Sequence, residues 1–398
     1  MASLDELLDE VSNPSRAYPD LDDHQEQAVL TRHPGAVVVD ATAGSGKTRV
    51  LTRRAVHLLR TGTNAKHLAV VTFTRKAAGV LQERMSQLGV TDLPVCATVH
   101  SLAWKMHPQE LASQEQLLAL CEELPSPWGP AETLLNVQRI RESQQRENIS
   151  DPLAIWFEEE LLNQGLKDFT DLLLQGVHRP NPKFKHILID EYQDLTPLQL
   201  QFLSLQLVEG GSLYLVGDTH QQIYSFRGSL STLDSLKPLR LSLPWNYRSA
   251  QTIVSLSSNL FEDTRINVRA IRQEQGKVTT FAFEDEQQEL ESCVAWLSES
   301  SNRALLGRTQ ESLTPYKELG LNAFTVHEAK GLEWDEVRII GCEQTNMPHI
   351  LGTMDEERRI FYVAMTRAVD CLEMTFCKTR SGHPRKPSSF LLDLQFTS

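Results

Sequence analysis

Short apolar runs alternate along the chain with segments in which apolar residues recur every three or four positions. The runs before residue 241 include Val37–Val39, Leu68–Val71, Ile187–Ile189 and Leu213–Val216. Continuous runs of this length are typical of parallel strands that are buried on both faces, and the longer repeats are typical of amphipathic helices. The alternation therefore predicts an α/β protein with parallel sheets.

The length of 398 residues allows two domains, each with a core of its own. We expect an N-terminal tail over residues 1–20, a first lobe over residues 21–240 and a second lobe over residues 241–398. Residues 104–183 are mostly helical in pattern and predict a helical insertion within the first lobe. The tail predicts a short acidic amphipathic helix, whose apolar positions are Leu4, Leu7, Leu8 and Val11.

The amino-acid composition restricts the cellular location of the protein more than the reaction that it catalyses. The formal net charge of −13 argues against tight binding to nucleic acid through the overall field, but it allows a locally basic groove. The six cysteines form no CxxC pair and no metal-ligand spacing, so we expect reduced thiols, most of them in the core. No apolar run has the length of a membrane span, and the acidic start lacks the pattern of a secretion signal. We therefore expect a soluble cytoplasmic protein without a membrane partner.

The segment AVVVDATAGSGKTRVL passes from a strand through a glycine-rich turn into a helix, which is the setting that a phosphate-binding loop requires. Gly44 and Gly46 let backbone N–H groups approach phosphates. Lys47 reaches the β and γ oxygens, and the Thr48 hydroxyl is suited to ligate Mg²⁺. The loop begins with Ala41 where the common pattern has glycine. We assign nucleotide binding to Ala43, Gly44, Ser45, Gly46, Lys47, Thr48 and Arg49.

Another apolar run delivers Asp190 and Glu191 side by side at the end of a predicted parallel strand, where open α/β sheets bind ligands. Taken alone, such a pair is more often two solvated acids. With a phosphate loop upstream, we expect Asp190 to hold Mg²⁺ and Glu191 to orient or deprotonate the attacking water. The two motifs together predict a hydrolase of ATP or GTP.

Other strand ends carry side chains that a single-stranded nucleic acid needs. Phe73 and Thr74 follow the run Leu68–Val71, and Thr98 and His100 follow the next strand. An aromatic ring stacks on a base, while hydroxyl and imidazole groups contact phosphates. Phe73 alone is more often a core residue, but the repetition at several strand ends favours a binding surface.

The segment VGDTHQQIYSFRG combines a glutamine with two aromatic residues and an arginine. Gln221 is suited to sense or position the γ-phosphate of a nucleotide. Tyr224, Phe226 and Arg227 are suited to stack bases and hold the backbone. The alternative interpretation is a glutamine at a helix start, followed by core aromatics.

The second lobe supplies a tyrosine and an arginine in the segment LSLPWNYRSAQTIV. The Tyr247 ring is suited to stack on adenine, and the Arg248 guanidinium is suited to reach the γ-phosphate across a cleft. Further along, HEAKGLEWDEV places His327 before a predicted strand, and a predicted helix carries Arg367. Isolated arginines on helices are usually solvated, so the surrounding motifs decide how these residues are interpreted.

The phosphate loop, TFTRKAA, TVHS, DEYQDLTPLQ, VGDTHQQIYSFRG, NYRS, TVHEAKGLEWDEV and EERRIFYVAMTRA together resemble the helicase motifs of the UvrD, Rep and PcrA group of superfamily 1, in the same order. The resemblance extends from about Leu21 to about Thr375. It implies two RecA-like P-loop lobes with ATP and Mg²⁺ between them. It also implies single-stranded DNA, or single/double-strand junctions, across their upper faces.

The same resemblance implies roles for individual residues. Gln25 matches the glutamine that reads adenine, although a lone glutamine is more often a surface residue. Glu333 matches the residue that contacts the ribose, and Arg367 matches the second arginine finger. His327 joins the expected DNA contacts. Phe226 stands where the family usually has tryptophan, which reduces the area available for stacking.

By resemblance, the chain is an ATP-dependent helicase or translocase that moves 3′ to 5′ along single-stranded DNA. One alternative is a DNA-stimulated ATPase subunit of a repair or anti-phage defence complex, which needs a protein partner such as a nuclease and does not unwind alone. Another is a signalling NTPase without nucleic acid. A large subdomain interrupts the second lobe in the family, but here only Thr314–Val326 separates the flanking motifs. This predicts a minimal motor whose monomer unwinds long duplexes poorly.

Overall fold

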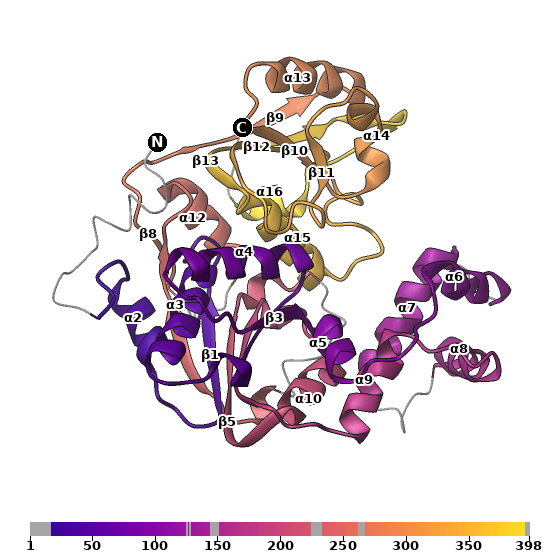
Figure 1. The fold of residues 1–398 in the computed structure, drawn as a ribbon. Coiled ribbons are helices and arrows are strands. Elements are labelled where there is room, and N and C mark those ends of the chain that lie inside the picture. The colour runs from indigo at the N-terminus through magenta and orange to yellow at the C-terminus, as the bar shows by residue number, and fades with distance from the viewer. Residues whose placement is uncertain are drawn as a thin grey trace.

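The computed structural model describes residues 17–124, 126, 129–143, 151–223, 233–261 and 267–394. The chain forms two parallel sheets flanked by helices, and a group of helices projects from one side of the first lobe (Figure 1). The predicted α/β fold with parallel sheets is confirmed. The amphipathic helix expected in the N-terminal tail lies outside the described residues.

The first sheet has six strands in the order β3-β2-β4-β5-β1-β6, and every neighbouring pair is parallel. Its strands are β1 (Ala36–Ala41), β2 (Leu68–Thr72), β3 (Val95–Thr98), β4 (Phe184–Asp190), β5 (Leu207–Gly217) and β6 (Leu239–Leu243). Ile187, Leu188 and Ile189 of β4 are fully buried, because helices cover both faces of the sheet. Each such side chain stabilises the fold by about 1.5–3 kcal/mol.

Two layers of helices enclose this sheet. The helices on one face are α2 (Asp23–Leu30), α3 (Lys47–Arg60) and α4 (Arg75–Gln87). The helices on the other face are α5 (Val99–Met106), α9 (Phe169–His178) and α10 (Pro197–Leu205). Three short 3₁₀ turns complete the described part of this lobe, namely η1 (Ala65–His67), η3 (Tyr192–Asp194) and η4 (Thr219–Gln221).

The helical insertion is smaller than its expected limits of 104–183. It consists of α6 (Gln114–Glu123), α7 (Pro130–Ser143) and α8 (Pro152–Asn163), which share a small core and project away from the sheet (Figure 1). Its expected limits also took in α9, but Leu172 and Leu173 of that helix pack in the core of the first lobe. Helical pattern alone does not distinguish a helix that covers a sheet from one that leaves it.

The second sheet has five parallel strands in the order β11-β10-β12-β13-β9. They are β9 (Lys277–Phe283), β10 (Arg303–Gly307), β11 (Ala323–Thr325), β12 (Trp334–Ile339) and β13 (Ala368–Cys377). The helices of this lobe are α12 (Gln251–Ser258), α13 (Glu286–Ser298), α14 (Gln310–Glu318), α15 (Met354–Met365) and α16 (Ser389–Asp393). Two small sheets pair β7 (Trp245–Asn246) with β8 (Arg269–Ala270), and β14 (Thr379–Arg380) with β15 (His383–Pro384).

Both expected lobe boundaries shift in the structure. Strand β6 crosses the expected limit at 240/241, because Leu239–Leu243 pairs with β1 and so belongs to the first sheet. At the other end, Tyr18 is buried, and the Asp20 carboxylate forms ion pairs with Arg49 and Arg53 of α3. Residues 17–20 therefore pack on the first lobe and are not a separate tail.

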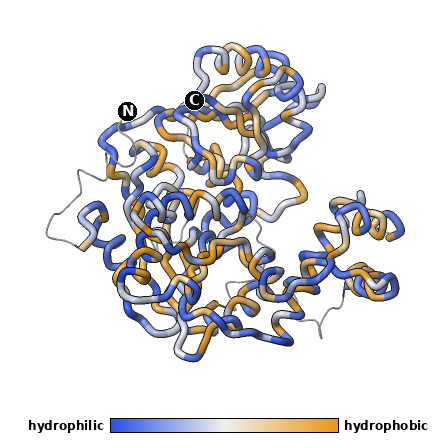
Figure 2. Tube along the Cα trace, in the orientation of Figure 1, coloured by the Kyte–Doolittle hydropathy of each residue, from blue (hydrophilic) through white to orange (hydrophobic). Residues whose placement is uncertain are grey.

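Apolar segments run through the interior of both lobes, and polar segments predominate on the outside (Figure 2). All six cysteines are described, and they are free thiols, five buried and one half-buried. This confirms that most of them are core residues. In the described part of the chain, no helix combines the length and apolar character that a membrane crossing needs.

Candidate active site

The order β4-β5-β1 brings three loops to one edge of the first sheet. The phosphate loop follows β1, and the pair Asp190–Glu191 ends β4. The segment Asp218–Gln221 follows β5 and lies between the other two. The carboxyl ends of parallel strands meet at the same edge, so these loops form a single surface.

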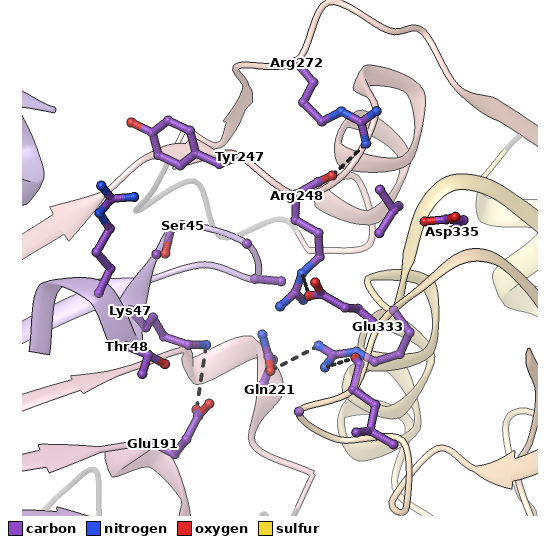
Figure 3. Close-up of a pocket in the computed structure, with 18 of the residues that line it drawn as sticks. Ser45, Lys47, Thr48, Glu191, Gln221, Tyr247, Arg248, Arg272, Glu333 and Asp335 are labelled. Carbon is purple, nitrogen blue, oxygen red and sulfur yellow. Dashed lines mark hydrogen bonds and ion pairs between the residues drawn. The ribbon is translucent and has the colours of Figure 1, made fainter. Parts of the chain in front are cut away.

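This surface and the second lobe enclose a cavity of about 760 Å³ (Figure 3). The volume is in the range of small-molecule and cofactor sites. The first lobe contributes all seven predicted loop residues, Ala43 to Arg49, together with Arg84, Glu191 and Gln221. The second lobe contributes Tyr247, Arg248, Arg272, Gly331, Leu332, Glu333, Asp335, Arg367 and Val369. Most of the residues predicted to bind and hydrolyse a nucleotide therefore meet in one place.

Two glycines of the phosphate loop have backbone conformations that side chains disfavour. The φ angles are +71° at Gly44 and +80° at Gly46. A Cβ atom at Gly44 would lie 2.7 Å from Cβ of Arg248, and one at Gly46 would lie 2.8 Å from Nε2 of Gln25. Gly46 also caps the N-terminus of α3, so the unpaired N–H groups of this helix face the loop. The loop therefore has the geometry of an anion site.

Gln25 and Tyr247 are both held by Asp22, the N-cap of α2. The Gln25 amide donates to the Ser45 carbonyl (3.0 Å), and its Oε1 accepts from the Asp22 N–H (3.3 Å). The Tyr247 hydroxyl donates to the Asp22 carboxylate (2.5 Å). Tyr247 lines the cavity, but Gln25 is fully buried behind the loop and is not among the described residues that line it. The structure thus brings only one of the two expected adenine contacts to the cavity.

Glu191, the second member of the acid pair, lies opposite the loop lysine, whereas Asp190 lines the smaller cavity described below and not the large one. Glu191 Oε2 is 3.7 Å from Lys47 Nζ and accepts a hydrogen bond of 2.6 Å from Gln193 (Figure 3 draws the first contact). Burial and the adjacent carboxylate raise the pKa of Asp190. Burial alone would raise the pKa of Glu191, but the charges of Lys47 and Lys330 outweigh it and lower that pKa. These two lysines therefore favour the ionised form of Glu191.

Arg367 lies in the turn between α15 and β13, not on the helix as expected, because α15 ends at Met365. Its side chain is almost fully buried, with 1% exposed. The guanidinium donates to the Val363 carbonyl (3.0 Å), the Leu332 carbonyl (3.2 Å) and Oε1 of Gln221 (3.4 Å). The last contact joins the two lobes across the cavity.

The two predicted arginine fingers differ in how their charges are balanced. Arg248 Nε lies 2.5 Å from the Glu333 carboxylate, so this expected ribose contact forms an ion pair instead (Figure 3). Within the described residues, every hydrogen bond that Arg367 donates goes to an uncharged oxygen. Burial and the charge of Arg248 lower the pKa of Arg367 to about 10, which leaves it protonated at neutral pH. An anionic ligand in the cavity would supply a countercharge in direct contact with this guanidinium.

A smaller cavity of about 240 Å³ lies on the other side of the acid pair. Phe73, Thr98 and His100 line it at the strand ends, and α7 of the insertion closes the opposite side. Phe73 is 46% exposed, which excludes the core interpretation. Glu191 lines both cavities, so it lies between the candidate nucleotide site and these expected DNA contacts.

The remaining expected DNA contacts are not all brought to this cavity. Thr74 caps α4 by accepting a hydrogen bond from the Ala77 N–H. His327 is half-buried, and burial together with the Arg308 charge lowers its pKa to about 4. Tyr224, Phe226 and Arg227 lie outside the described residues.

Sequence reasoning missed several residues that the structure places in the site. Arg84 of α4 and Arg272 line the large cavity but lie outside the recognised motifs. Asp335 also lines it and lies within the quoted segment HEAKGLEWDEV, although no function was predicted for it. Gln193 lies within the quoted segment DEYQD, yet no role was assigned to it.

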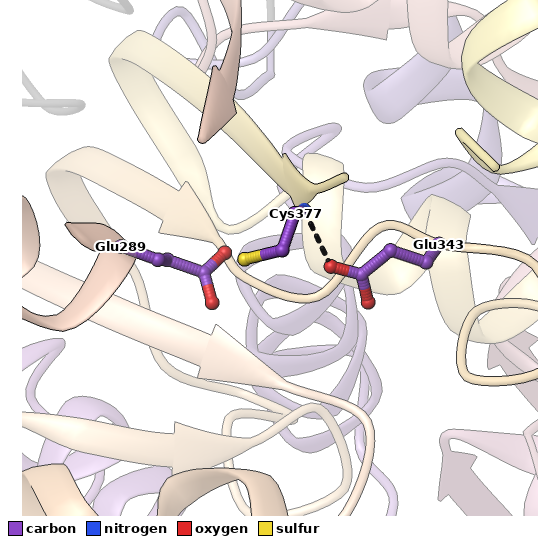
Figure 4. A group of neighbouring side chains, drawn as sticks. All are labelled: Glu289, Glu343 and Cys377. Carbon is purple, nitrogen blue, oxygen red and sulfur yellow. Dashed lines mark hydrogen bonds between the residues drawn. The ribbon is translucent and has the colours of Figure 1, made fainter. Parts of the chain in front are cut away.

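One further group of side chains resembles a metal site. Ligand atoms of Glu289, Glu343 and Cys377 all lie within 4.8 Å of one another (Figure 4). The Arg380 guanidinium already pairs with both carboxylates, at 2.6 Å from Glu289 and 2.9 Å from Glu343. Their charge is therefore balanced by a side chain, and the group attaches the β14–β15 hairpin to the second lobe.

Comparisons with known proteins agree with this geometry. The family model described as "AAA domain" matches residues 25–227, which is half of the chain, and "UvrD-like helicase C-terminal domain" matches residues 304–379. DNA helicase II of Salmonella typhimurium is 29% identical over 61% of this chain. A probable DNA helicase of Mycoplasma pneumoniae is 24% identical over 92%, and the ATP-dependent DNA helicase UvrD2 of Mycobacterium tuberculosis is 25% identical over 93%.

The matches cover different shares of these relatives. The aligned region spans 40% of the length of the Salmonella protein, 85% of the Mycoplasma protein and 81% of the mycobacterial one. The chain therefore matches less than half of the longer DNA helicase II.

Proposed function

The chain belongs to the UvrD-like helicases of superfamily 1, and from this premise we propose that it is an ATP-driven motor that moves 3′ to 5′ along single-stranded DNA. The observation that carries the proposal is the large cavity, where the phosphate loop and Glu191 of the first lobe face Arg248 and Arg367 of the second. A nucleotide there would contact both lobes at once. Its binding and hydrolysis would therefore change the separation of the lobes.

The donor set at the loop suits Mg·ATP. Lys47 would bind the β- and γ-phosphates, and the Thr48 hydroxyl and Asp190 carboxylate are hard oxygen ligands of the kind that Mg²⁺ prefers. Because burial disfavours the charged form of Asp190, this carboxylate would gain from a nearby cation. When bound, Mg²⁺ would neutralise charge on the phosphates. The choice of ATP over GTP is supported by the name of the mycobacterial relative, which is called an ATP-dependent DNA helicase.

The other site residues would have different roles in binding and hydrolysis of the nucleotide. The ionised Glu191 would orient the attacking water and accept its proton. Arg367 and Arg248 would stabilise the charge on the transferring phosphoryl group, as arginine fingers do in other phosphoryl-transfer enzymes. Tyr247 at the cavity wall would stack on the base, and Gln25 would act by holding the phosphate loop through Ser45.

Single-stranded DNA would bind at the strand ends beside the smaller cavity. The exposed ring of Phe73 would stack on a base, and Thr98 and His100 would contact the backbone. The position of Glu191 between the two cavities supports coupling, because a base that moves beside it would alter the surroundings of the catalytic carboxylate. In the proposed cycle, alternate closing and opening of the lobes advances the strand.

The compact second lobe favours a motor that translocates more readily than it unwinds. Between the two motifs where the family has a large subdomain, the structure has only α14, a short turn and the three-residue strand β11. The acidic net charge would also shorten residence on DNA as salt is raised. The same compact lobe also supports a second candidate function, that of a DNA-stimulated ATPase subunit that unwinds only with a protein partner.

The test compares three activities of the purified chain. The proposal expects ATP hydrolysis that single-stranded DNA stimulates, translocation towards the 5′ end, and weak single-turnover unwinding of a long 3′-tailed duplex by the monomer. A hydrolysis rate that single-stranded DNA does not change would refute the proposal of a DNA-dependent motor. Movement in the opposite direction would refute the polarity, and processive unwinding by the monomer would refute the minimal motor.

A further inference from the structure

Gln193 is a fully buried side chain that contacts two parts of the candidate active site. Its Nε2 donates to Oε2 of Glu191 (2.6 Å), and its Oε1 accepts from the backbone N–H of Asp218 (3.0 Å). The first partner is the proposed general base on the loop after β4. The second begins the loop after β5, which lies between the acid pair and the phosphate loop.

The chemistry of the two partners fixes the orientation of this amide. A carboxylate only accepts hydrogen bonds and a backbone N–H only donates them, so a flipped amide would lose both contacts. The neighbouring backbone also leaves room for it, because a Cβ atom at Gly217 would lie 2.2 Å from Gln193 Oε1. Gly217 and Gln193 therefore fit together as a pair.

The Glu191 backbone gives this contact particular importance. Its φ angle of +52° lies in the left-handed region, which is uncommon and unfavourable for residues other than glycine. Lys47 approaches the Glu191 carboxylate only to 3.7 Å, whereas the Gln193 amide is at 2.6 Å. Of these two side chains, Gln193 therefore makes the closer contact with the Glu191 carboxylate. This contact helps to hold a residue whose backbone conformation is unfavourable.

The same amide begins a chain of contacts that reaches the second lobe. The Asp218 carboxylate accepts a hydrogen bond from Gln221 Nε2 (2.8 Å). Gln221 Oε1 in turn accepts from Arg367 (3.4 Å). A continuous path therefore leads from Glu191 through Gln193 to the proposed arginine finger.

We propose that Gln193 is a positioning residue, which holds the Glu191 carboxylate in place and ties it to the Asp218–Gln221 loop that meets Arg367. The assignment rests on the proposed function, since Glu191 acts on water only if the chain hydrolyses ATP. Through this link, the approach of Arg367 as the lobes close orients the general base at the same time.

The test replaces Gln193 with methionine, which keeps the volume of the side chain and removes both hydrogen bonds. Gln206→Met is the matched control, because Gln206 is equally buried and its amide also bridges backbone groups, Phe202 O and Asn181 N, away from the cavity. We expect Gln193→Met to lower kcat for DNA-stimulated hydrolysis by about 10- to 100-fold, the size of effect that misplacing a catalytic group produces. The KM for ATP should change by less than about threefold, since uniform binding of nucleotide is not affected.

Three outcomes decide the inference. If the wild type is active and Gln193→Met matches Gln206→Met in kcat, the inference is overturned and the proposed function stands. If the wild type hydrolyses no ATP, the proposed function fails, and hydrogen exchange of the Asp218 amide then tests the link. Faster exchange in Gln193→Met than in Gln206→Met would support the link, and equal protection would overturn it.

Discussion

Replacing Arg367 with methionine should separate catalysis from stability in this protein. The change removes a charge from the cavity but nearly preserves the volume of a side chain that is only 1% exposed. An arginine finger contributes about 10³-fold or more to phosphoryl transfer, which corresponds to about 4 kcal/mol of transition-state stabilisation. We therefore expect the stimulated hydrolysis rate to fall by about 10³ while ADP binding changes little.

The effect on stability should be small, because removing the buried charge of Arg367 offsets most of the hydrogen bonds that are lost. The variant removes one donor from the Leu332 carbonyl and one from the Val363 carbonyl, which keeps the hydrogen bond from the Thr366 hydroxyl, so each loss is about 1 kcal/mol or less. It also removes a buried charge that donates only to uncharged oxygens within the described residues, and this gain offsets much of the loss. The melting temperature should thus move by only a few degrees.

Arg338→Met is the matched control in the same lobe. Arg338 is 4% exposed, and its guanidinium forms a buried ion pair with Glu373 at 2.6 Å on the second sheet. Breaking such a pair costs about 3–5 kcal/mol, so this variant should lower stability and leave the hydrolysis rate of the folded protein nearly intact.

The two variants should therefore show opposite patterns in single-turnover hydrolysis at saturating Mg·ATP and in thermal unfolding. A rate loss below tenfold in Arg367→Met would remove this residue from the catalytic set. A rate loss that follows unfolding in the same way for both variants would show that the arginine is structural.

Four further predictions follow from other parts of the molecule. Glu191→Gln should lower the hydrolysis rate by about 10²–10⁴ and keep Mg·ATP binding; weakened binding of the nucleotide, measured by fluorescence titration, would contradict the division of roles with Asp190. Phe73→Ala should weaken single-strand binding by about 1–3 kcal/mol with unchanged basal hydrolysis, measured by fluorescence anisotropy, and an unchanged affinity would remove this ring from the DNA contacts. Arg380→Met should destabilise the second lobe by about 3–5 kcal/mol in chemical denaturation, because two buried carboxylates lose their cation, and a change below 1 kcal/mol would show that they are neutral. Burial lowers the pKa of His327 to about 4 from 6.5, so its contribution to stability is complete above pH 6.5 and is lost as pH falls towards 4; His327→Gln should flatten this part of the stability–pH curve, and an unchanged slope would refute the assignment.

The sequence was most informative where the chemistry is local. The phosphate loop requires Gly44, Gly46 and Lys47 within four positions, and the acid pair is adjacent in the chain, so both could be recognised without the structure. The apolar runs also predicted the buried parallel strands, because a strand covered on both faces tolerates few polar residues.

Contacts between distant segments could not be predicted in this way. The Gln25 amide turns to Ser45 because Asp22 caps α2 and fixes the helix start, which no pattern of apolar residues reveals. Arg84 reaches the cavity only because α4 packs along the first sheet. The limit between the lobes was misplaced for a similar reason, since strand β6 joins the sheet through pairing with a strand some 200 residues earlier in the chain.

The turn between α14 and β11 is a suitable place to insert a reporter domain into the second lobe. Leu319 in this turn is 58% exposed, and the neighbouring Gly320 has no atom within 4 Å of the position of an added Cβ. Strand β11 lies at the edge of the second sheet, far along the strand order from β9, so an inserted domain would interrupt no pairing between inner strands. Exposed turns accept inserted domains readily, and the entropy of closing a longer loop grows only slowly with its length. A fluorescent domain fused there would move with the second lobe and report its displacement from the first lobe in single-molecule experiments.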